Sequence, residues 1–309
     1  MKNWFMFGLL GLIWGSSFLL IKIGLTGVDP FVLVAGRLSL AAIAFVIFIV
    51  VTRRRFPHDL PTLITLAVVG LGTTAFPFLL ITWGENTIDS GLAGVLDATT
   101  PLFSLVIAHL MLEDDKITLG KLLGLITGFT GIILLATRSS DPTHPNPLAG
   151  QLAVIVASIS YGASAVATRR YLRHVDPMIV PCSALVVGAV VTGALALLVT
   201  HPLPTIAALE SRVILSIVGL AVVNTFIAYM LYFTLIANWG ASRATMVTYL
   251  IPPTSILLGV LVASEPFDWK IAVGTILIVG GVGLATFLKG TPGPVAAEIS
   301  ELESAKFVE

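Results

Sequence analysis

Long runs of apolar residues, separated by short polar connections, dominate the chain. An α-helix rises about 1.5 Å per residue, so roughly 20 apolar residues cross the hydrocarbon core of a bilayer. Ten runs are of about that length. They cover residues 5–26, 31–51, 60–83, 88–112, 117–137, 149–171, 178–199, 211–234, 241–263 and 269–289. The pattern predicts an all-α integral membrane protein with ten transmembrane helices.

The two halves of the sequence resemble each other. A shift of 147 residues aligns 14–30 with 161–177 without a gap, and both stretches end in Val-Asp-Pro. A second similarity, around Pro101 and Pro252, follows in the same order, which argues against chance similarity between apolar segments. Because five is an odd number of crossings, the second copy must enter the membrane in the opposite sense. We expect a first repeat at 1–138, a proline-rich linker at 139–148, a second inverted repeat at 149–289 and a polar C-terminal tail at 290–309.

Inverted repeats are typical of secondary transporters, which bind substrate near the membrane midplane where the repeats meet. The composition agrees with a membrane protein throughout, with 56% hydrophobic residues, 11% charged residues and a mean hydropathy of +1.00. The net charge is zero, so nothing suggests a nucleic-acid partner. The single cysteine, Cys182, excludes a disulfide framework within the chain.

Lysine and arginine predict the orientation. With a cytoplasmic N-terminus, the inner loops and helix ends carry twelve of these residues and the outer ones carry three. The positive-inside rule therefore places both termini in the cytoplasm of a multi-pass protein of the cell (inner or plasma) membrane.

Several motifs in this order resemble the drug/metabolite transporter superfamily, in its ten-helix EamA-type branch. They are LIWGSSFLLIK in the first segment, Arg37 in the second, GLAGVLDATTPLFSLVIAHLMLED from the fourth, and GASRATMVTYLIPPTSILLGVLVASE from the ninth. The resemblance covers about residues 5–289 and includes amino-acid and aromatic amino-acid exporters. It implies export of metabolites through a central cavity lined by helices 1, 3, 4, 6, 8 and 9, with helices 5 and 10 as packing helices.

Two charged residues, Arg37 and Asp97, lie well inside apolar segments. A charge near the membrane centre costs about 2.5–3.5 kcal/mol on the insertion scale, so these side chains must face protein or water. Two interpretations stay open. The residues either pair with each other or with backbone groups and so hold the outer half together, or they bind the carboxylate and ammonium groups of a zwitterion, with Asp97 as an alternative proton carrier.

Two further charges mark the outer ends of their helices. Lys22 lies one turn from the outer end of the first segment, where it can snorkel or act at a gate. Glu85 follows Trp83 at the outer end of the third segment, and we expect it at the rim, with a gate charge as the alternative.

Aromatic and hydroxyl residues inside the helices predict the substrate site. Trp14 and Tyr161 are repeat partners, and both fall inside the membrane instead of in the interfacial belts. Pro77 predicts a bend beside Phe78. The predicted substrate-binding residues are Trp14, Ser17, Phe78, Asp97, Thr100, Tyr161, Ser164, Asn224, Tyr229, Thr248 and Tyr249.

No spacing of the kind found in catalytic, metal or phosphate sites occurs, so we expect neither an enzyme nor a cofactor. The sequence predicts a secondary transporter that exports small metabolites, with amino acids as the first choice of substrate and with halves that rock about Pro101 and Pro252. The solute gradient, or a proton if Asp97 titrates, would supply the energy. Nucleotide sugars, sugar phosphates and drug cations are the alternative substrates. Glycines of helices 5 and 10 predict close packing, with a homodimer contact as the alternative.

Overall fold

The computed structural model describes residues 1–113, 116–137, 146–201 and 203–287, and in this part of the chain it contains helices and no strands. The helices are α1 (Lys2–Gly24), α2 (Pro30–Val51), α3 (Leu60–Thr73), α4 (Ala75–Glu85), α5 (Ser90–Asp97), α6 (Thr100–Met111), α7 (Leu119–Ala136), α8 (Leu148–Tyr171), α9 (Ile179–Val199), α10 (Ser211–Val218), α11 (Ala228–Trp239), α12 (Ala241–Thr245), α13 (Ile251–Val262) and α14 (Trp269–Phe287). The predicted tail at 290–309, and the linker as far as residue 145, lie outside the described residues.

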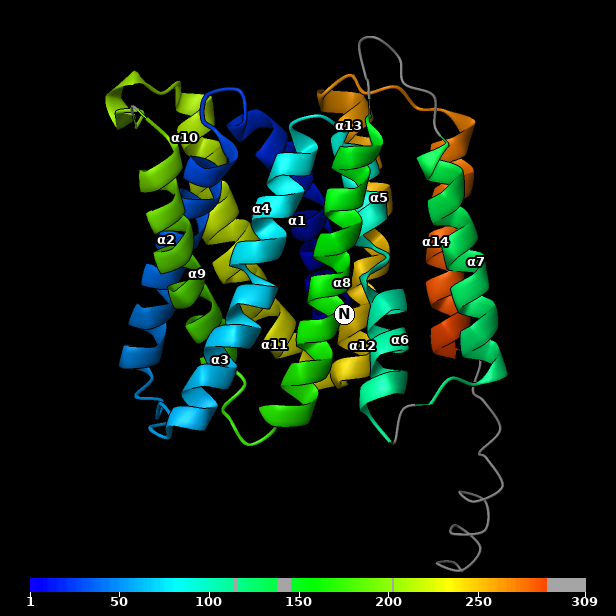
Figure 1. Cartoon of the computed structure of the whole chain (residues 1–309), viewed down its shortest axis with the longest axis horizontal. Coiled ribbons are helices and arrows are strands. Elements are labelled where there is room, and N and C mark those ends of the chain that lie inside the picture. The colour runs from blue at the N-terminus through cyan, green and yellow to red at the C-terminus, as the bar shows by residue number, and fades with distance from the viewer. Residues whose placement is uncertain (114–115, 138–145, 202, 288–309) are drawn as a thin grey trace, which may run out of the picture.

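Within the described residues, ten helical spans are long and apolar enough to cross a membrane, and they form one upright bundle (Figure 1). The connections α1–α2, α4–α5, α9–α10 and α13–α14 lie at the upper end in Figure 1, and α2–α3, α8–α9 and α11–α12 lie at the lower end. The first helix of the first repeat, α1, therefore runs upward, whereas α8, its counterpart in the second repeat, runs downward. The two five-helix repeats are inverted, as the odd number of crossings predicted.

Four of the ten spans are interrupted instead of regular. The third span breaks at Thr74, between α3 and α4, and the fourth breaks between α5 and α6. The eighth contains a π-helix, Gly219–Ile227, and the ninth contains a 3₁₀ segment, Met246–Leu250. Proline explains three of these breaks, because it lacks an N–H and its ring clashes with the carbonyl four residues earlier. Pro77, Pro101 and Pro252 each stand just after the irregular stretch.

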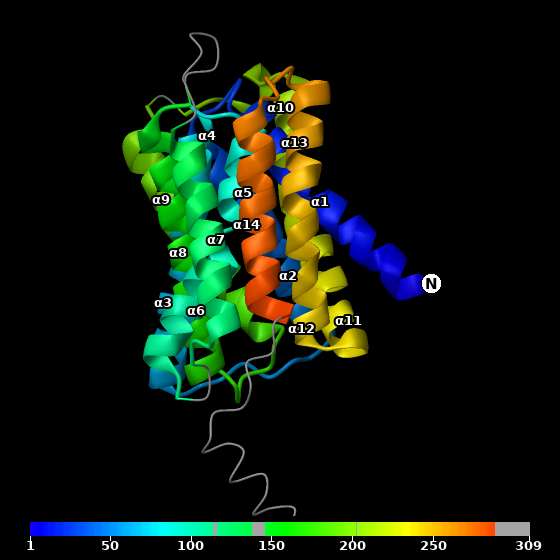
Figure 2. The ribbon, with the colours of Figure 1, turned by 90° about the vertical axis from the view of Figure 1, so that its right-hand side faces the viewer.

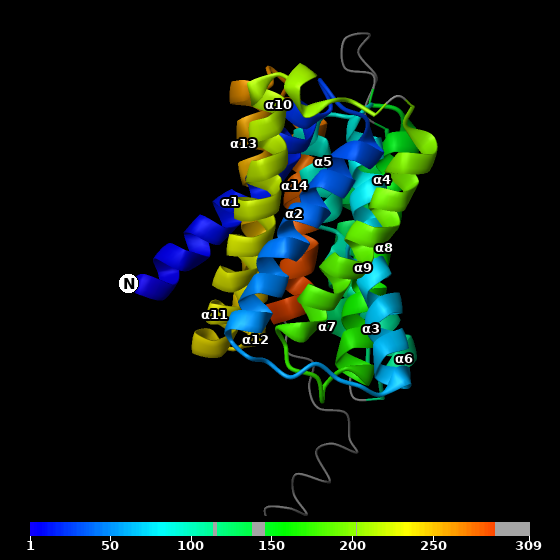
Figure 3. The same cartoon turned by 90° about the vertical axis from the view of Figure 1, so that its left-hand side faces the viewer.

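The buried centre of the bundle surrounds α5, where every residue from Ser90 to Leu96 is buried. The first half of α1, by contrast, leans away from the other helices (Figures 2 and 3). Its Trp4 is 69% exposed and touches Trp239 of α11, with ring centroids 4.8 Å apart. Burial on α1 begins at Met6 and Leu10, which pack in a core cluster with residues of α11 and α12.

Glycines bring α7 and α14 together at one edge of the bundle (Figure 1). A Cβ atom on Gly281 would lie 2.5 Å from the backbone nitrogen of Gly128 and 2.6 Å from the carbonyl oxygen of Gly124. These glycines therefore meet within one chain, as close packing requires. Gly280 and Gly283 have no such neighbours, and a homodimer contact through this edge stays a prediction.

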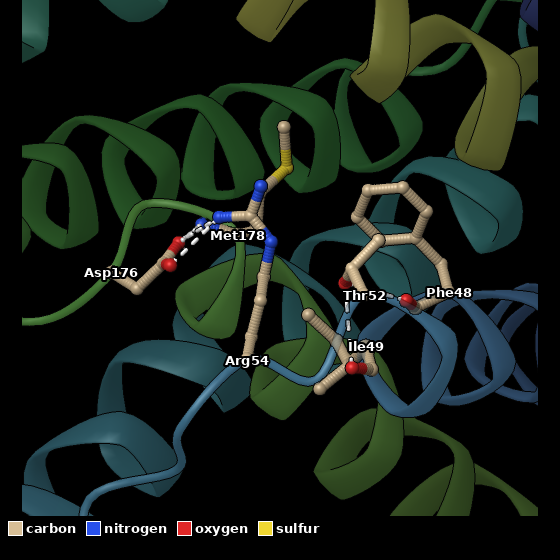
Figure 4. Close-up of polar contacts among 6 residues, drawn as sticks. All are labelled: Phe48, Ile49, Thr52, Arg54, Asp176 and Met178. Carbon is tan, nitrogen blue, oxygen red and sulfur yellow. Dashed lines mark hydrogen bonds and ion pairs between the residues drawn. The ribbon is translucent and has the colours of Figure 1, made fainter.

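The repeated Val-Asp-Pro motif fastens both ends of the α2–α9 pair. At the upper end Asp29 caps α2, and its other oxygen accepts a hydrogen bond of 2.6 Å from Thr200, just beyond α9. At the lower end Asp176 accepts a bond from the backbone of Met178 and two, of 2.8 and 2.7 Å, from Arg54, just beyond α2 (Figure 4). The two clasps are related by the repeat, although one is ionic and the other is not.

Candidate functional site

The break between α5 and α6 places a polar group deep in the bundle. Pro101 cannot donate to the carbonyl of Asp97, which instead accepts from the Thr100 hydroxyl at 2.8 Å. The preceding carbonyl, of Leu96, accepts from Thr99 at 2.6 Å and from Ser158 of α8 at 3.3 Å. Hydroxyl groups thus satisfy the backbone where the helix is interrupted, as a membrane requires.

The carboxylate of Asp97 is left incomplete. Its side chain is half-buried, and its Oδ1 is buried without a hydrogen-bond partner among the described residues. Buried carboxylate oxygens normally accept hydrogen bonds, since an unpaired one carries a desolvation cost of about 1–3 kcal/mol or more. The site therefore has an acceptor to offer.

Arg37 lies in the same region with donors to spare. It is 8% exposed, its Nε donates to Thr225 at 3.1 Å, and its guanidinium carbon lies 4.1 Å from the ring centroid of Phe78. The described residues provide no carboxylate within ion-pair distance of Arg37, although its charge interacts with those of Asp97 and Glu85. The direct Arg37–Asp97 pair considered from the sequence is therefore not formed.

Aromatic rings complete this central group, which we define as Arg37, Phe78, Asp97, Tyr161 and Tyr229. The Phe78 and Tyr161 rings meet edge to face with centroids 6.4 Å apart. Tyr229 contacts Phe45 and stacks on Phe233. The group thus brings together one cation, one carboxylate and three aromatic rings, from α2, α4, α5, α8 and α11, and all five residues are candidates from the sequence.

A second polar group joins α1 to the π-helix. Asn224 is buried, and its Nδ2 donates to the carbonyl of Ile13 and to the hydroxyls of Ser16 (3.1 Å) and Ser17 (3.0 Å). Trp14, on the same stretch of α1, packs on Tyr232 with ring centroids 5.2 Å apart. Trp14, Ser17 and Asn224 are therefore neighbours of one another.

Other predicted residues have local partners. Ser164 is buried against Gly72, whose Cβ would lie 2.3 Å from the Ser164 hydroxyl. Thr248 donates to the carbonyl of Thr245, and the Tyr249 hydroxyl is 2.9 Å from that of Thr286 on α14. Tyr249 therefore points toward a packing helix, because the 3₁₀ turn before Pro252 rotates this part of the span.

The two charges predicted at the outer rim are placed differently. Lys22 does not snorkel, since its ammonium donates to the carbonyls of Glu85 (2.9 Å) and Ile88 (2.7 Å) at the end of α4. Glu85 is no rim residue, because it is 0% exposed. α1 covers it on one side, where the Lys22 ammonium bonds the Glu85 carbonyl.

A cavity of about 350 Å³ lies in the lower half, between α3, α8, α9 and α11. Its lining includes Thr73, Thr168, Phe233 and the Tyr229 of the central group. Arg169 and Arg173 also line it, and both are exposed at the lower end of α8. Its volume lies within the range of about 300–1,000 Å³ that is usual for small-molecule sites.

The sequence profile of the EamA-like transporter family matches residues 2–137 and 148–287. The chain belongs to this family. A protein of Archaeoglobus fulgidus, named an uncharacterized transporter, is 27% identical over 286 residues, which cover 91% of this transporter and 98% of its relative. One of Streptantibioticus cattleyicolor, named a probable terminal-alkyne amino-acid exporter, is 26% identical over 275 residues, or 88% and 89% of the two chains. A crystal structure of 19% identity superposes with a TM-score of 0.64 over 96% of this transporter and 98% of its own chain, which shows a shared fold.

Some parts of the site in this transporter were missed from the sequence. One is Ser158, whose hydroxyl donates to the Leu96 carbonyl at the break between α5 and α6. The sequence did contain a signal for it, because Ser158 lies one helical turn from Tyr161 on an otherwise apolar helix. The cavity and the clasp between Arg54 and Asp176 depend on how the two repeats pack, which no local pattern records.

Proposed function

We propose that this membrane transporter exports small zwitterionic metabolites, amino acids above all, by alternating access. The observation that carries the proposal is the unpartnered Oδ1 of Asp97 at the break between α5 and α6, in one group with Arg37. A bound ammonium group supplies the donor that Asp97 lacks, and a carboxylate supplies the acceptor that Arg37 lacks. Such charge-assisted hydrogen bonds contribute about 1.5–3 kcal/mol each.

The surroundings favour a ligand of this size and chemistry. Phe78, Tyr161 and Tyr229 offer aromatic faces beside the two charges. The cavity reaches Tyr229 from the lower end, so a solute approaches the central group from there. If the lower end faces the cytoplasm, as the positive-inside rule predicts, the protein is poised to load an intracellular solute.

The other substrate classes fit less well. A nucleotide sugar or sugar phosphate needs several cationic side chains around its phosphates, and the central group holds Arg37 alone. A drug cation needs an acidic site without a nearby cation, and Arg37 stands beside Asp97. The name of the Streptantibioticus relative, which refers to an amino-acid exporter, supports the same choice.

Uptake into proteoliposomes, measured with a panel of radiolabelled amino acids, nucleotide sugars and drug cations, tests the proposal. We expect saturable transport of at least one amino acid. Asp97→Asn should reduce it about tenfold or more, because the neutral asparagine amide cannot form a charge-assisted hydrogen bond as an anion to the substrate ammonium. Asp59→Asn is the matched control, because Asp59 is an exposed cap of α3 far from the predicted site and asparagine also caps helices, so this variant should transport normally. Transport of a nucleotide sugar or drug cation without any amino acid would reject the substrate assignment.

A further inference from the structure

A carboxyl group is sealed into the upper end of the bundle. Glu85, the last residue of α4, is 0% exposed, and neither of its carboxylate oxygens has a hydrogen-bond partner in the described part of the chain. We define the upper seal as Glu85 and the surrounding residues Lys22, Ile88, Ser90 and Glu265. These residues join α1, the α4–α5 connection and the α13–α14 connection. Such a group needs a physical explanation.

The other two charged residues of the upper seal, Lys22 and Glu265, form hydrogen bonds with backbone groups. The Lys22 ammonium donates to the carbonyls of Glu85 and Ile88, at the C-terminal end of α4. The carboxylate of Glu265 accepts from the backbone nitrogens of Ser90 (2.7 Å) and Gly91 (2.9 Å), at the N-terminal end of α5. Both arrangements suit the helix dipole. Neither provides a donor for the Glu85 carboxylate.

The wider surroundings offer little compensation. The charges that act on Glu85 are the cations Lys22 and Arg37 and the anions Glu265 and Asp97. The helices α3 and α9, which also pack against α4, contain no Asp, Glu, Lys, Arg or His, and the upper half of α8 contains none. The C-terminal carbonyls of α4 themselves disfavour a negative charge at this position.

A buried ion without hydrogen bonds is among the most costly arrangements in a protein, whereas a protonated carboxyl is a modest one. The closed upper end therefore fits a neutral Glu85. An ionised Glu85 requires water or the third N–H of the Lys22 ammonium. In the closed arrangement neither Glu85 oxygen accepts a bond from that ammonium, so either partner requires the seal to rearrange.

We propose that Glu85 is a proton-binding site whose protonation closes the upper end and whose ionisation opens it. The proton enters from the aqueous phase at the upper end and adds to a carboxylate oxygen, so one charge is neutralised as the seal forms. This coupling rests on the alternating-access mechanism proposed above. It makes Glu85, and not Asp97, the residue whose proton is linked to the conformational cycle.

Infrared spectroscopy of the whole protein in lipid nanodiscs tests the proton site without any substrate. The C=O stretch of a protonated carboxylic acid should be present at neutral pH, should disappear in Glu85→Gln, and should persist in Asp97→Asn. If Glu85→Gln does not fold, Glu85→Asp keeps the acid and should shift the band. A spectrum of Glu85→Gln identical to that of the parent protein would overturn the proposal.

Cysteine labelling tests the coupling. With Cys182→Ala removing the native thiol, Ser90→Cys places a near-isosteric thiol at a position that is 0% exposed in the seal. Between about pH 5 and about pH 9, the rate of maleimide labelling should rise more steeply in the protein that keeps Glu85 than in the one that also carries Glu85→Gln. At high pH the two labelling rates should differ about tenfold or more. The thiol chemistry is common to both, so the ratio isolates Glu85. Equal rates would overturn the coupling, whether or not amino-acid transport is found.

Discussion

Arg37 is held almost entirely by uncharged groups. Its Nε bonds a threonine hydroxyl and its guanidinium lies over Phe78. A buried charge without a direct ionic partner is weak evidence for stability, because desolvation offsets much of what its contacts contribute. Intramembrane charges retained under that penalty are functional-site candidates by default.

We expect Arg37→Met to separate these roles. Methionine keeps most of the apolar stem, so the thermal unfolding temperature in detergent should stay the same or rise. Amino-acid transport should fall about tenfold, since a charge-assisted hydrogen bond to the substrate carboxylate is lost. Fluorescence-detected unfolding and proteoliposome uptake measure the two effects.

The matched control is Arg54→Met. That side chain is 32% exposed and paired with Asp176, so its loss should change stability only slightly and leave transport intact. A fall in unfolding temperature of more than about 4 °C in Arg37→Met, with normal transport, would instead assign Arg37 a structural role.

At the residue scale, the sequence was most informative about polar side chains in apolar surroundings. Arg37, Asp97 and Tyr161 were identifiable because a charge or a phenol inside a membrane must find a partner. Glu85 was misplaced because its burial depends on α1 and on the surroundings of Glu265 in the other repeat, which no local pattern records. The partner of Tyr249 was missed for a different reason, since it depends on the 3₁₀ turn within its own span, from which Tyr249 reaches Thr286 of α14.

Among the helices, the positions of the interruptions at proline could be predicted from the sequence, but the type of helical turn at the other interruption could not. Pro77, Pro101 and Pro252 predict interruptions, and the structure contains them. The π-helix has no comparable signal, because Gly219–Ile227 is an ordinary apolar stretch apart from Asn224 and Thr225. There Thr225 donates back to Leu220, five residues earlier, which matches the wider turn.

The α7–α14 contact gives a prediction with neighbouring test and control positions. Gly281→Ala places a methyl group within 2.5 Å of backbone atoms, so the helices must separate. We expect the free energy of unfolding to fall by about 1–3 kcal/mol. Gly280→Ala, one residue away, meets nothing within 4 Å and should be neutral or slightly stabilising, because alanine favours helix.

Unfolding in mixed micelles of increasing denaturing-detergent content measures both variants. A clear loss in Gly281→Ala alone would support the backbone contact. If both alanines had the same effect, or if Gly280→Ala were the more harmful, the tight contact between α7 and α14 would not describe the folded protein. Loss of self-association in Gly280→Ala would point instead to the homodimer contact predicted from the sequence.

At the scale of the whole molecule, the inverted repeat makes the two ends nearly equivalent, and a few residues make them differ. The α2–α9 pair is clasped by Asp29 above and Asp176 below. The lower end nevertheless has a cavity beside Tyr229, whereas Glu85, Ser90 and Glu265 of the upper seal are buried. Repeat symmetry was visible in the sequence, but this asymmetry was not, since it depends on single differences between the repeats. The 147-residue shift, for example, aligns Arg37 of the central group with Ala184, which lines the cavity.

Orientation decides what that asymmetry means, and it has a direct test. The lower end carries most of the lysine and arginine, including Arg53, Arg54 and Arg55, so the positive-inside rule assigns it to the cytoplasm. In a Cys182→Ala background, Thr26→Cys at the upper end should react with an impermeant maleimide on intact cells. His58→Cys at the lower end should react only after permeabilisation. Both positions are exposed, so access and not burial sets the result. The reverse pattern would place the cavity outside the cell, and the same site would then load for import, not export.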